Sequence, residues 1–267
     1  MKSLFTLDGG IYLPTPWAVG PWDPNLIHGS STAALFAYGF EAQLPGAEWL
    51  LARLSIDIFR PVAVAPTSLR GEVVRDGKRI KLADLFIEQG GVVVARAKGL
   101  MLLPGEDAAA PAPGGNPVGS WRDYPTAPDV AVGDRPQFNA DVEFRPTRPA
   151  ASGPGFAVWI RVPYAILPDT PMSPTVRAAA VADITNAVGI WSLPDLRGFI
   201  NADIDLTLHR RPQGEWICLE STGRPDARGI AVSSVNVHDE AGLLGGASTV
   251  CLAKPMQLFG KGVVPGA

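Results

Sequence analysis

Two stretches of the chain space their apolar residues as a buried helix does, at intervals of three, four and seven positions. The first runs from about His28 to the Pro45-Gly46 pair. The second, RAAAVADITNAVGIWSL at residues 177–193, is apolar around most of its circumference. Its middle carries one carboxylate, Asp183. A charge costs several kcal/mol in such surroundings unless a partner or a function uses it, so Asp183 is the first candidate functional residue.

Runs in which apolar and polar residues alternate flank both helices, as expected for strands of an antiparallel sheet. Each half of the chain has two such runs before its helix and four after it. The clearest internal match is between LSIDIFRP (54–61) and IDLTLHRRP (204–212), which share the alternation and the Arg-Pro ending. The predicted strands are 2–7, 11–16, 49–62, 68–76, 79–89 and 92–103 in the first half, and 138–146, 156–164, 199–210, 214–222, 230–239 and 243–254 in the second. One helix against one antiparallel sheet, repeated, predicts an α+β layered fold.

A Pro- and Gly-rich stretch separates the two halves and has the composition of a linker. The predicted organisation is therefore a first unit at 1–104, a linker at 105–135 and a second unit at 136–267. Trp121 and Tyr124 within the linker predict that part of it packs against the protein.

Composition narrows the functional classes. The 267 residues are 46% hydrophobic and 18% charged with a formal charge of -3, which fits a soluble globular protein and not a nucleic-acid-binding surface. No 18-residue apolar segment could span a bilayer, and MKSLFTLDGG lacks the features of a signal peptide, so we expect a cytoplasmic protein. Cys218 and Cys251 are far from any CxxC pattern and are predicted to be buried apolar groups rather than a disulfide or a metal site.

The sequence gives little support for other kinds of catalytic site. GxSxG is absent, and the histidines lie in unrelated contexts, so a Ser-His-Asp triad is not predicted. His209 and His238 follow apolar runs near strand ends and are expected on the surface. For Asp183 a purely structural role remains open, as the partner of Arg177 or of Arg197.

The order of several longer phrases resembles the TesB-like acyl-CoA thioesterase family over nearly the whole chain. These phrases are PWDPNLIHGSSTAALFAYGFEA, ARLSIDIFRPV and GEVVRDGKRIKLADLFIEQGGVVVARAKGLMLLP in the first half, and AAAVADITNAVG, INADIDLTLHRRPQGEWICLE and GLLGGASTVCLAKP in the second. The resemblance implies a double hotdog fold, in which two tandem units each wrap an antiparallel sheet around a central helix. It further implies one continuous sheet with both helices on its concave side.

The resemblance also implies a role for the acid in the second helix. In the family an Asp there, a Thr or Ser on a neighbouring strand and a Gln on the last strand hold the water that attacks the thioester. The matching positions in this chain are Asp183, Asn201 and Thr249. Asn201 and Thr249 differ from the usual residues, but each can donate and accept hydrogen bonds and so could still orient a water.

A thioesterase also needs donors for the negative charge that develops on the carbonyl oxygen. His28, Gly29 and Ser30 open the first helix, where backbone N–H groups and the helix dipole favour an anion and a glycine allows close approach. The family resemblance implies that this helix start faces Asp183. His28 is either a hydrogen-bonding group of the site or an ordinary helix-start residue. Ser30 is expected to cap the helix.

The acyl chain is expected between the two helices. Phe36, Phe40 and Ile184 are candidate wall residues, although the same side chains would serve as core in any such fold.

Three functions follow from these patterns. The first is hydrolysis of an acyl-CoA thioester, with CoA present only as part of the substrate and with no other cofactor or metal. The second is acyl-CoA or lipid binding without hydrolysis, which the residues at 201 and 249 keep open. The third is an enoyl-CoA hydratase-like activity, which the lack of a nearby Asp-His pair around Asp183 disfavours. We expect a monomer or a homo-oligomer of double hotdog units.

Overall fold

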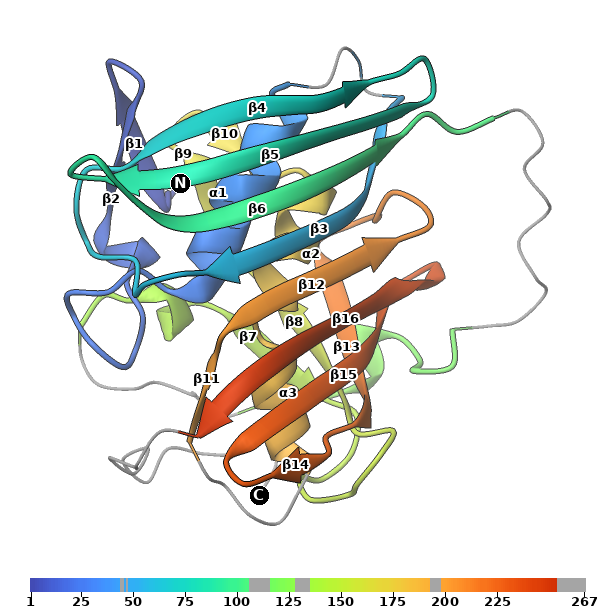
Figure 1. The fold of residues 1–267 in the computed structure, drawn as a ribbon. Coiled ribbons are helices and arrows are strands. Elements are labelled where there is room, and N and C mark those ends of the chain that lie inside the picture. The colour runs from blue at the N-terminus through green and yellow to red at the C-terminus, as the bar shows by residue number, and fades with distance from the viewer. Residues whose placement is uncertain (44–45, 47, 106–115, 128–134, 193–197, 254–267) are drawn as a thin grey trace.

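The two halves of the chain share one long antiparallel sheet, seen in a computed structural model (Figure 1). The parts that the structure describes are residues 1–43, 46, 48–105, 116–127, 135–192 and 198–253. The strands of the first half are β1 Phe5–Asp8, β2 Ile11–Pro14, β3 Leu50–Ile58, β4 Ser68–Asp76, β5 Ile80–Gln89 and β6 Val92–Leu102.

The second half carries the same pattern of strands with several short additions. Its strands are β7 Glu143–Pro146, β8 Ala157–Arg161, β9 Ala165–Leu167, β10 Thr170–Pro171, β11 Phe199–Asn201, β12 Asp203–Leu208, β13 Trp216–Gly223, β14 Asp226–Ala227, β15 Ile230–Asp239 and β16 Gly242–Ala253. The hairpins β1–β2 and β9–β10 lie outside the main sheet.

The main sheet has the order β4-β5-β6-β3-β12-β16-β15-β13-β8-β7, with β11 on β16 and β14 on β15. Strands β3 and β12 join the halves in antiparallel register, with Leu206 opposite Leu54 and Ile204 opposite Ile56. These four side chains are buried, so apolar contacts continue across the junction. The predicted continuous antiparallel sheet is confirmed.

The helices cover one face of this sheet. Figure 1 shows α1 (Gly29–Glu41) behind the first-half strands, and α2 (Pro174–Ala182) and α3 (Thr185–Trp191) behind those of the second half. Three short 3₁₀ helices complete the described structure: η1 Pro16–Ala18, η2 Trp121–Asp123 and η3 Phe138–Ala140. The largest hydrophobic cluster runs through both halves and includes residues from α1, α2, β3 and β12.

The predicted second helix is interrupted, which corrects the expectation of one long helix. Asp183 and Ile184 form a turn between α2 and α3. The Ile184 N–H donates to the carbonyl of Val181, three residues back instead of four, at 2.9 Å. Asn201 Nδ2 donates to the carbonyl of Asp183 at 2.9 Å. A side chain from β11 thus satisfies the backbone where the helix tightens, and the apolar spacing on both sides is unaffected.

Part of the predicted linker packs on the outer face of the second half. Trp121 stacks on Trp216 with ring centroids 4.7 Å apart, and the Tyr124 hydroxyl donates to the carbonyl of Val118. The expectation that Trp121 and Tyr124 pack is therefore confirmed. Residues 106–115 and 128–134 of that linker lie outside the described residues.

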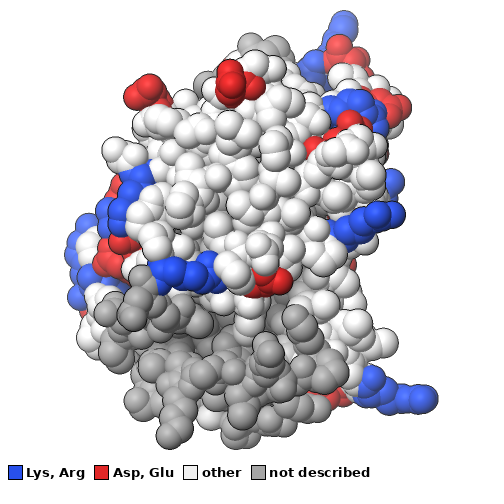
Figure 2. Space-filling model, turned by 90° about the vertical axis from the view of Figure 1, so that its left-hand side faces the viewer, with Lys and Arg blue, Asp and Glu red and all other residues white. Residues whose placement is uncertain are grey.

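Within the described ranges, no helix has the length and apolar character needed to cross a membrane. Figure 2 shows the face that carries the β1–β2 hairpin, whose centre is largely uncharged. Basic and acidic side chains lie next to each other around it. Charges of opposite sign at close range cancel over distance, so the described residues of this face produce no extended field of one sign.

Candidate active site

Asp183 lies at the turn between α2 and α3 and is buried, with 8% of the residue exposed. Its Oδ1 accepts a hydrogen bond from Asn201 Nδ2 at 2.8 Å, and the same nitrogen donates to its backbone carbonyl. Asn201 is the last residue of β11. The α2–α3 turn and β11 thus meet at the Asp183 carboxylate. The Asn201 amide holds both the backbone and the side chain of Asp183.

The start of α1 lies directly against this carboxylate. A Cβ atom on Gly29 would be 2.2 Å from Oδ1 and 2.8 Å from Oδ2 of Asp183, so the absence of a side chain makes the contact possible. The Ser30 hydroxyl donates to Oδ2 at 3.1 Å, and Ser30 is fully buried. The structure therefore brings the first-half helix start and the second-half acid together, which is the arrangement that the family resemblance implied.

His28 caps α1 and borders the same carboxylate. Its Nδ1 accepts the Ser30 N–H at 3.0 Å and lies 3.2 Å from Oδ2 of Asp183. Nδ1 cannot make both contacts at once: it accepts from the Ser30 N–H when it carries no hydrogen, and it donates to the carboxylate when it carries one. Phe138 stacks on the imidazole at 4.5 Å between centroids, which fixes the plane of the ring.

These neighbours determine the charge of Asp183. Burial alone raises the pKa of this carboxyl, but the close His28 ring and the donors Asn201 and Ser30 outweigh it, and the pKa lies below its usual value. Asp183 is therefore a buried carboxylate at neutral pH.

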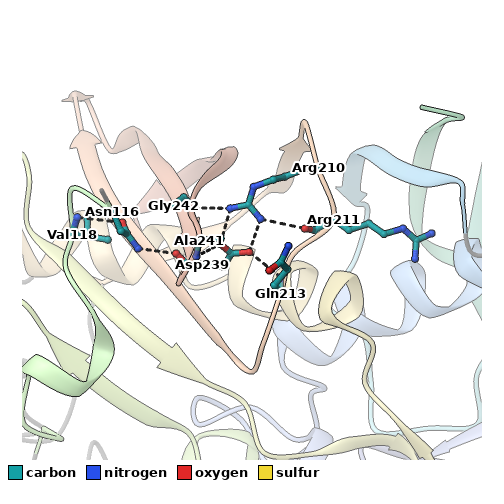
Figure 3. Close-up of polar contacts among 8 residues, drawn as sticks. All are labelled: Asn116, Val118, Arg210, Arg211, Gln213, Asp239, Ala241 and Gly242. Carbon is teal, nitrogen blue, oxygen red and sulfur yellow. Dashed lines mark hydrogen bonds and ion pairs between the residues drawn. The ribbon is translucent and has the colours of Figure 1, made fainter. Parts of the chain in front are cut away.

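A second buried carboxylate, Asp239, shows by contrast what a structural acid looks like (Figure 3). Both of its oxygens bind the Arg210 guanidinium, at 2.6 and 2.7 Å. The backbone N–H groups of Gln213 and Ala241 donate to the same carboxylate at 2.8 Å each. Its backbone carbonyl accepts from Asn116 at 2.7 Å. The network ties the linker, the loop after β12 and the β15–β16 turn together.

Asp183 has no such cationic partner among the described residues. Arg177 was one candidate, but its Nη1 donates to the carbonyl of Gly214 at 3.1 Å. The other candidate, Arg197, lies outside the described residues. In the part of the chain that the structure describes, His28 is the one ionisable side chain that contacts the Asp183 carboxylate, and no arginine binds it as Arg210 binds Asp239.

The last strand contributes a residue that the sequence analysis missed. Thr249 is fully buried, but its hydroxyl contacts Cys251 Sγ at 3.3 Å and it has no described contact with Asp183. Cys251 is the direct partner of Asn201 across the β11–β16 pair, with Sγ 3.6 Å from Asn201 Oδ1. Strand alternation puts residues 249 and 251 on one face, and this signal could have made Cys251 a candidate beside Thr249.

Phe36 and Phe40 are core residues. Neither has any exposed surface, and the Phe40 ring faces β6, where a Cβ on Gly99 would lie 2.5 Å from it. Ile184 is also buried. All three side chains belong to the hydrophobic core, and a role of any of them in contacting an acyl chain stays a prediction.

Two hollows on the described surface lie away from Asp183. One of about 230 Å³ is on the sheet at Asp205 and Thr207, and one of about 490 Å³ lies beside Trp121 and Trp216. In the described parts of the chain, no group of three or more His, Cys, Asp or Glu side chains is arranged to hold a metal ion.

The predictions of buried cysteines and exposed histidines are confirmed except at one histidine. Cys218 and Cys251 are free and buried, as predicted. His209 is exposed, as predicted. His238 is buried, contrary to prediction, because it lies under the packed linker side of the sheet with Nε2 3.1 Å from Glu220 Oε2.

Family comparisons cover both halves. A family described as "Acyl-CoA thioesterase N-terminal domain" matches residues 18–102, and one described as "Acyl-CoA thioesterase C-terminal domain" matches residues 107–252. No curated protein matches the sequence.

Several solved structures share the fold at low sequence identity. A conserved hot dog protein of unknown function from Alicyclobacillus acidocaldarius is 17% identical with a TM-score of 0.71, covering 94% of this chain and 96% of that one. A putative thioesterase from Novosphingobium aromaticivorans is 19% identical with a TM-score of 0.71, over 94% and 98%. An acyl-CoA thioesterase II from Mycobacterium marinum is 16% identical with a TM-score of 0.64, over 95% of each chain. These similarities show a tandem hotdog fold.

Proposed function

Because this chain belongs to the acyl-CoA thioesterase family, we propose that it hydrolyses an acyl-CoA thioester to a free acid and CoA. The observation that carries the proposal is the ionised, buried Asp183, held by Asn201 directly over Gly29 at the start of α1. It has no arginine or lysine partner among the described residues, and the buried Asp239 shows that this chain pairs a structural acid with arginine.

In this proposal Asp183 orients and deprotonates the attacking water. Oδ2 already accepts from the Ser30 hydroxyl and borders His28, whereas the donor given for Oδ1 is Asn201. A carboxylate oxygen can accept two hydrogen bonds, so Oδ1 has capacity for a water. The water oxygen adds to the thioester carbonyl carbon as its proton passes to Asp183. The carbon–sulfur bond then breaks, and the proton goes to the departing thiolate.

Gly29 supplies the complementary electrostatics. No described residue accepts a hydrogen bond from the Gly29 N–H, and Gly29 is only partly buried. The group lies at the positive end of α1, where it can donate to the oxyanion that forms on the carbonyl. Base and oxyanion donor therefore come from different halves of the chain.

The test is release of free thiol from a panel of acyl-CoA chain lengths. We expect Asp183→Asn to lower kcat by about 10²-fold or more, the usual scale for loss of a general base, with the fold and the acyl-CoA affinity retained. Asp205→Asn is the matched control, because it makes the same change on the sheet surface. Turnover within a few-fold of wild type in D183N would contradict the proposal. A wild type that binds acyl-CoA without releasing thiol would instead favour a binding protein.

A further inference from the structure

Cys251 lies behind the residue that holds Asp183. Strands β11 and β16 pair so that Asn201 and Cys251 are direct cross-strand partners. The Cys251 Sγ is 3.6 Å from Asn201 Oδ1, within the range of a thiol hydrogen bond. The residue is 1% exposed and forms no disulfide. It touches Asp183 only through Asn201.

The orientation of the Asn201 amide depends on what each of its ends meets. Its Nδ2 donates to two oxygens of Asp183, the carbonyl at 2.9 Å and Oδ1 at 2.8 Å. This leaves Asn201 Oδ1 as an acceptor on the opposite side, and Cys251 is the donor described for it. An amide turned end for end would place its oxygen against two acceptors and its nitrogen against sulfur, so both contacts favour one orientation.

Thr249 completes this chain of contacts. Its hydroxyl lies 3.3 Å from Cys251 Sγ, and either atom can be the donor. When the hydroxyl donates to sulfur, the single thiol hydrogen is left for one of two acceptors, Asn201 Oδ1 or the backbone carbonyl of Thr249, each 3.6 Å from Sγ. The polar contacts then run from Thr249 through Cys251 and Asn201 to Asp183, all among buried or half-buried groups.

We propose that Cys251 is a positioning residue of the hydrolytic site, whose thiol holds the Asn201 amide in the orientation that directs both of its N–H bonds to Asp183. This inference rests on the proposed hydrolysis. Cys251 has no nucleophilic role in it: burial raises the pKa of the thiol, which keeps the hydrogen that it donates. The thiol is a weak donor, so its removal is expected to weaken the alignment rather than abolish it.

The chain contains a matched control for this proposal. Cys218 is also free and completely buried, but it packs with Trp159 and Trp216 in a cluster on the other face of the sheet. Cys251→Ala and Cys218→Ala therefore remove the same atom from two buried places. Cys251→Ser restores a donor at the first place. If C251A does not fold, Cys251→Val removes the donor while keeping the space filled.

Kinetics and titration test the proposal together. We expect C251A to lower kcat by about fivefold or more at unchanged KM, the scale of one weakened alignment, while C218A and C251S stay within about twofold of wild type. The second readout is the pH titration of the Asp183 carboxyl carbon by NMR, assigned with D183N. A weaker hydrogen bond from Asn201 is expected to raise the pKa of Asp183 in C251A. The substitution does not alter the contact between Asp183 and His28, the other ionisable group that faces it.

The two proposals can fail separately. Equal kcat and equal Asp183 titration in C251A and C218A would overturn the role of Cys251, whatever the wild-type activity. A wild type that releases no thiol would overturn the hydrolase proposal, and the titration would still decide whether Cys251 aligns Asn201. A fall in melting temperature of C251A without either effect also counts against positioning.

Discussion

A methyl group on Gly29 would lie 2.2 Å from Oδ1 of Asp183, far inside van der Waals contact. We therefore expect Gly29→Ala to displace the carboxylate and to lower kcat by about 10²-fold or more, as misplacement of a catalytic group by about 1 Å does. Alanine favours a helix more than glycine does, so the melting temperature is expected to fall little.

Gly20→Ala is the matched control for this prediction. A Cβ there meets only ordinary contacts with His28, at 3.6 Å and beyond. Thiol release and thermal melting of both variants provide the measurement. Full activity in G29A would show that the carboxylate does not have to remain against the start of α1.

At the scale of single residues, the sequence identified several of the residues that lie together around Asp183, and their catalytic roles stay predictions. Asp183 is conspicuous because a charge interrupts an apolar pattern, and Gly29 because it follows the helix-start residue His28. The position on the last strand was harder, because alternation places Thr249 and Cys251 on the same face and does not tell which one meets Asn201. That depends on the register of β11 on β16, a pairing between distant segments that local pattern leaves open.

At the level of elements, the loop after β12 depends on one ion pair. Arg210 binds the fully buried Asp239 through two nitrogens, and the same carboxylate accepts from the backbone of Gln213 (Figure 3). Removing one partner leaves the other charge buried and unpaired, which typically costs about 3–5 kcal/mol. We expect Arg210→Met to lower the free energy of unfolding by roughly that amount, as measured by urea denaturation.

Arg70→Met tests whether the loss of stability expected for Arg210→Met depends on burial of the ion pair. Arg70 pairs with Glu88 at 2.9 Å, but half of its side chain is exposed, and such pairs contribute about 1 kcal/mol or less. The kcat of folded R210M is expected to stay near that of wild type, since Asp239 has no described contact with Asp183. Equal destabilisation by the two variants would argue against a structural role specific to Asp239.

The elements themselves were predictable to different degrees. Strict alternation identified the long strands, and repetition of their order identified the two halves. The break at Asp183 was not predictable from apolar spacing, because the residues before it are buried without a gap and most of those after it are buried too. Its cause is a hydrogen bond from Asn201 to the Asp183 carbonyl, which comes from another element.

For the whole molecule, buried titratable groups set how stability depends on pH. Burial lowers the pKa of His238, and the facing Glu220 and Asp239 oppose this only in part. The unfolded chain binds a proton near pH 6.5, whereas the folded protein binds it only at lower pH. This contribution to stability is present above about pH 6.5 and is lost as the pH falls toward the folded pKa.

Urea denaturation at a series of pH values between about 7 and 5 measures this slope. His238→Gln is expected to flatten it, whereas His209→Gln, at an exposed position, is expected to leave it unchanged. The lowered pKa of Asp183 acts separately, since its contribution is lost below about pH 4, where the unfolded carboxyl takes up a proton. An equally steep slope in H238Q would assign the effect to another group.

The starts of α1 and α2 are chemically different. α1 begins with Gly29, whose N–H is free of described partners, whereas α2 begins with Pro174, which has no N–H to offer. An assembly of two identical subunits would carry every substitution twice, in symmetric positions. Joining both halves in one reading frame removes that constraint. One half could thus evolve toward binding the oxyanion and the other toward activating water, each mutation being selected on one side alone.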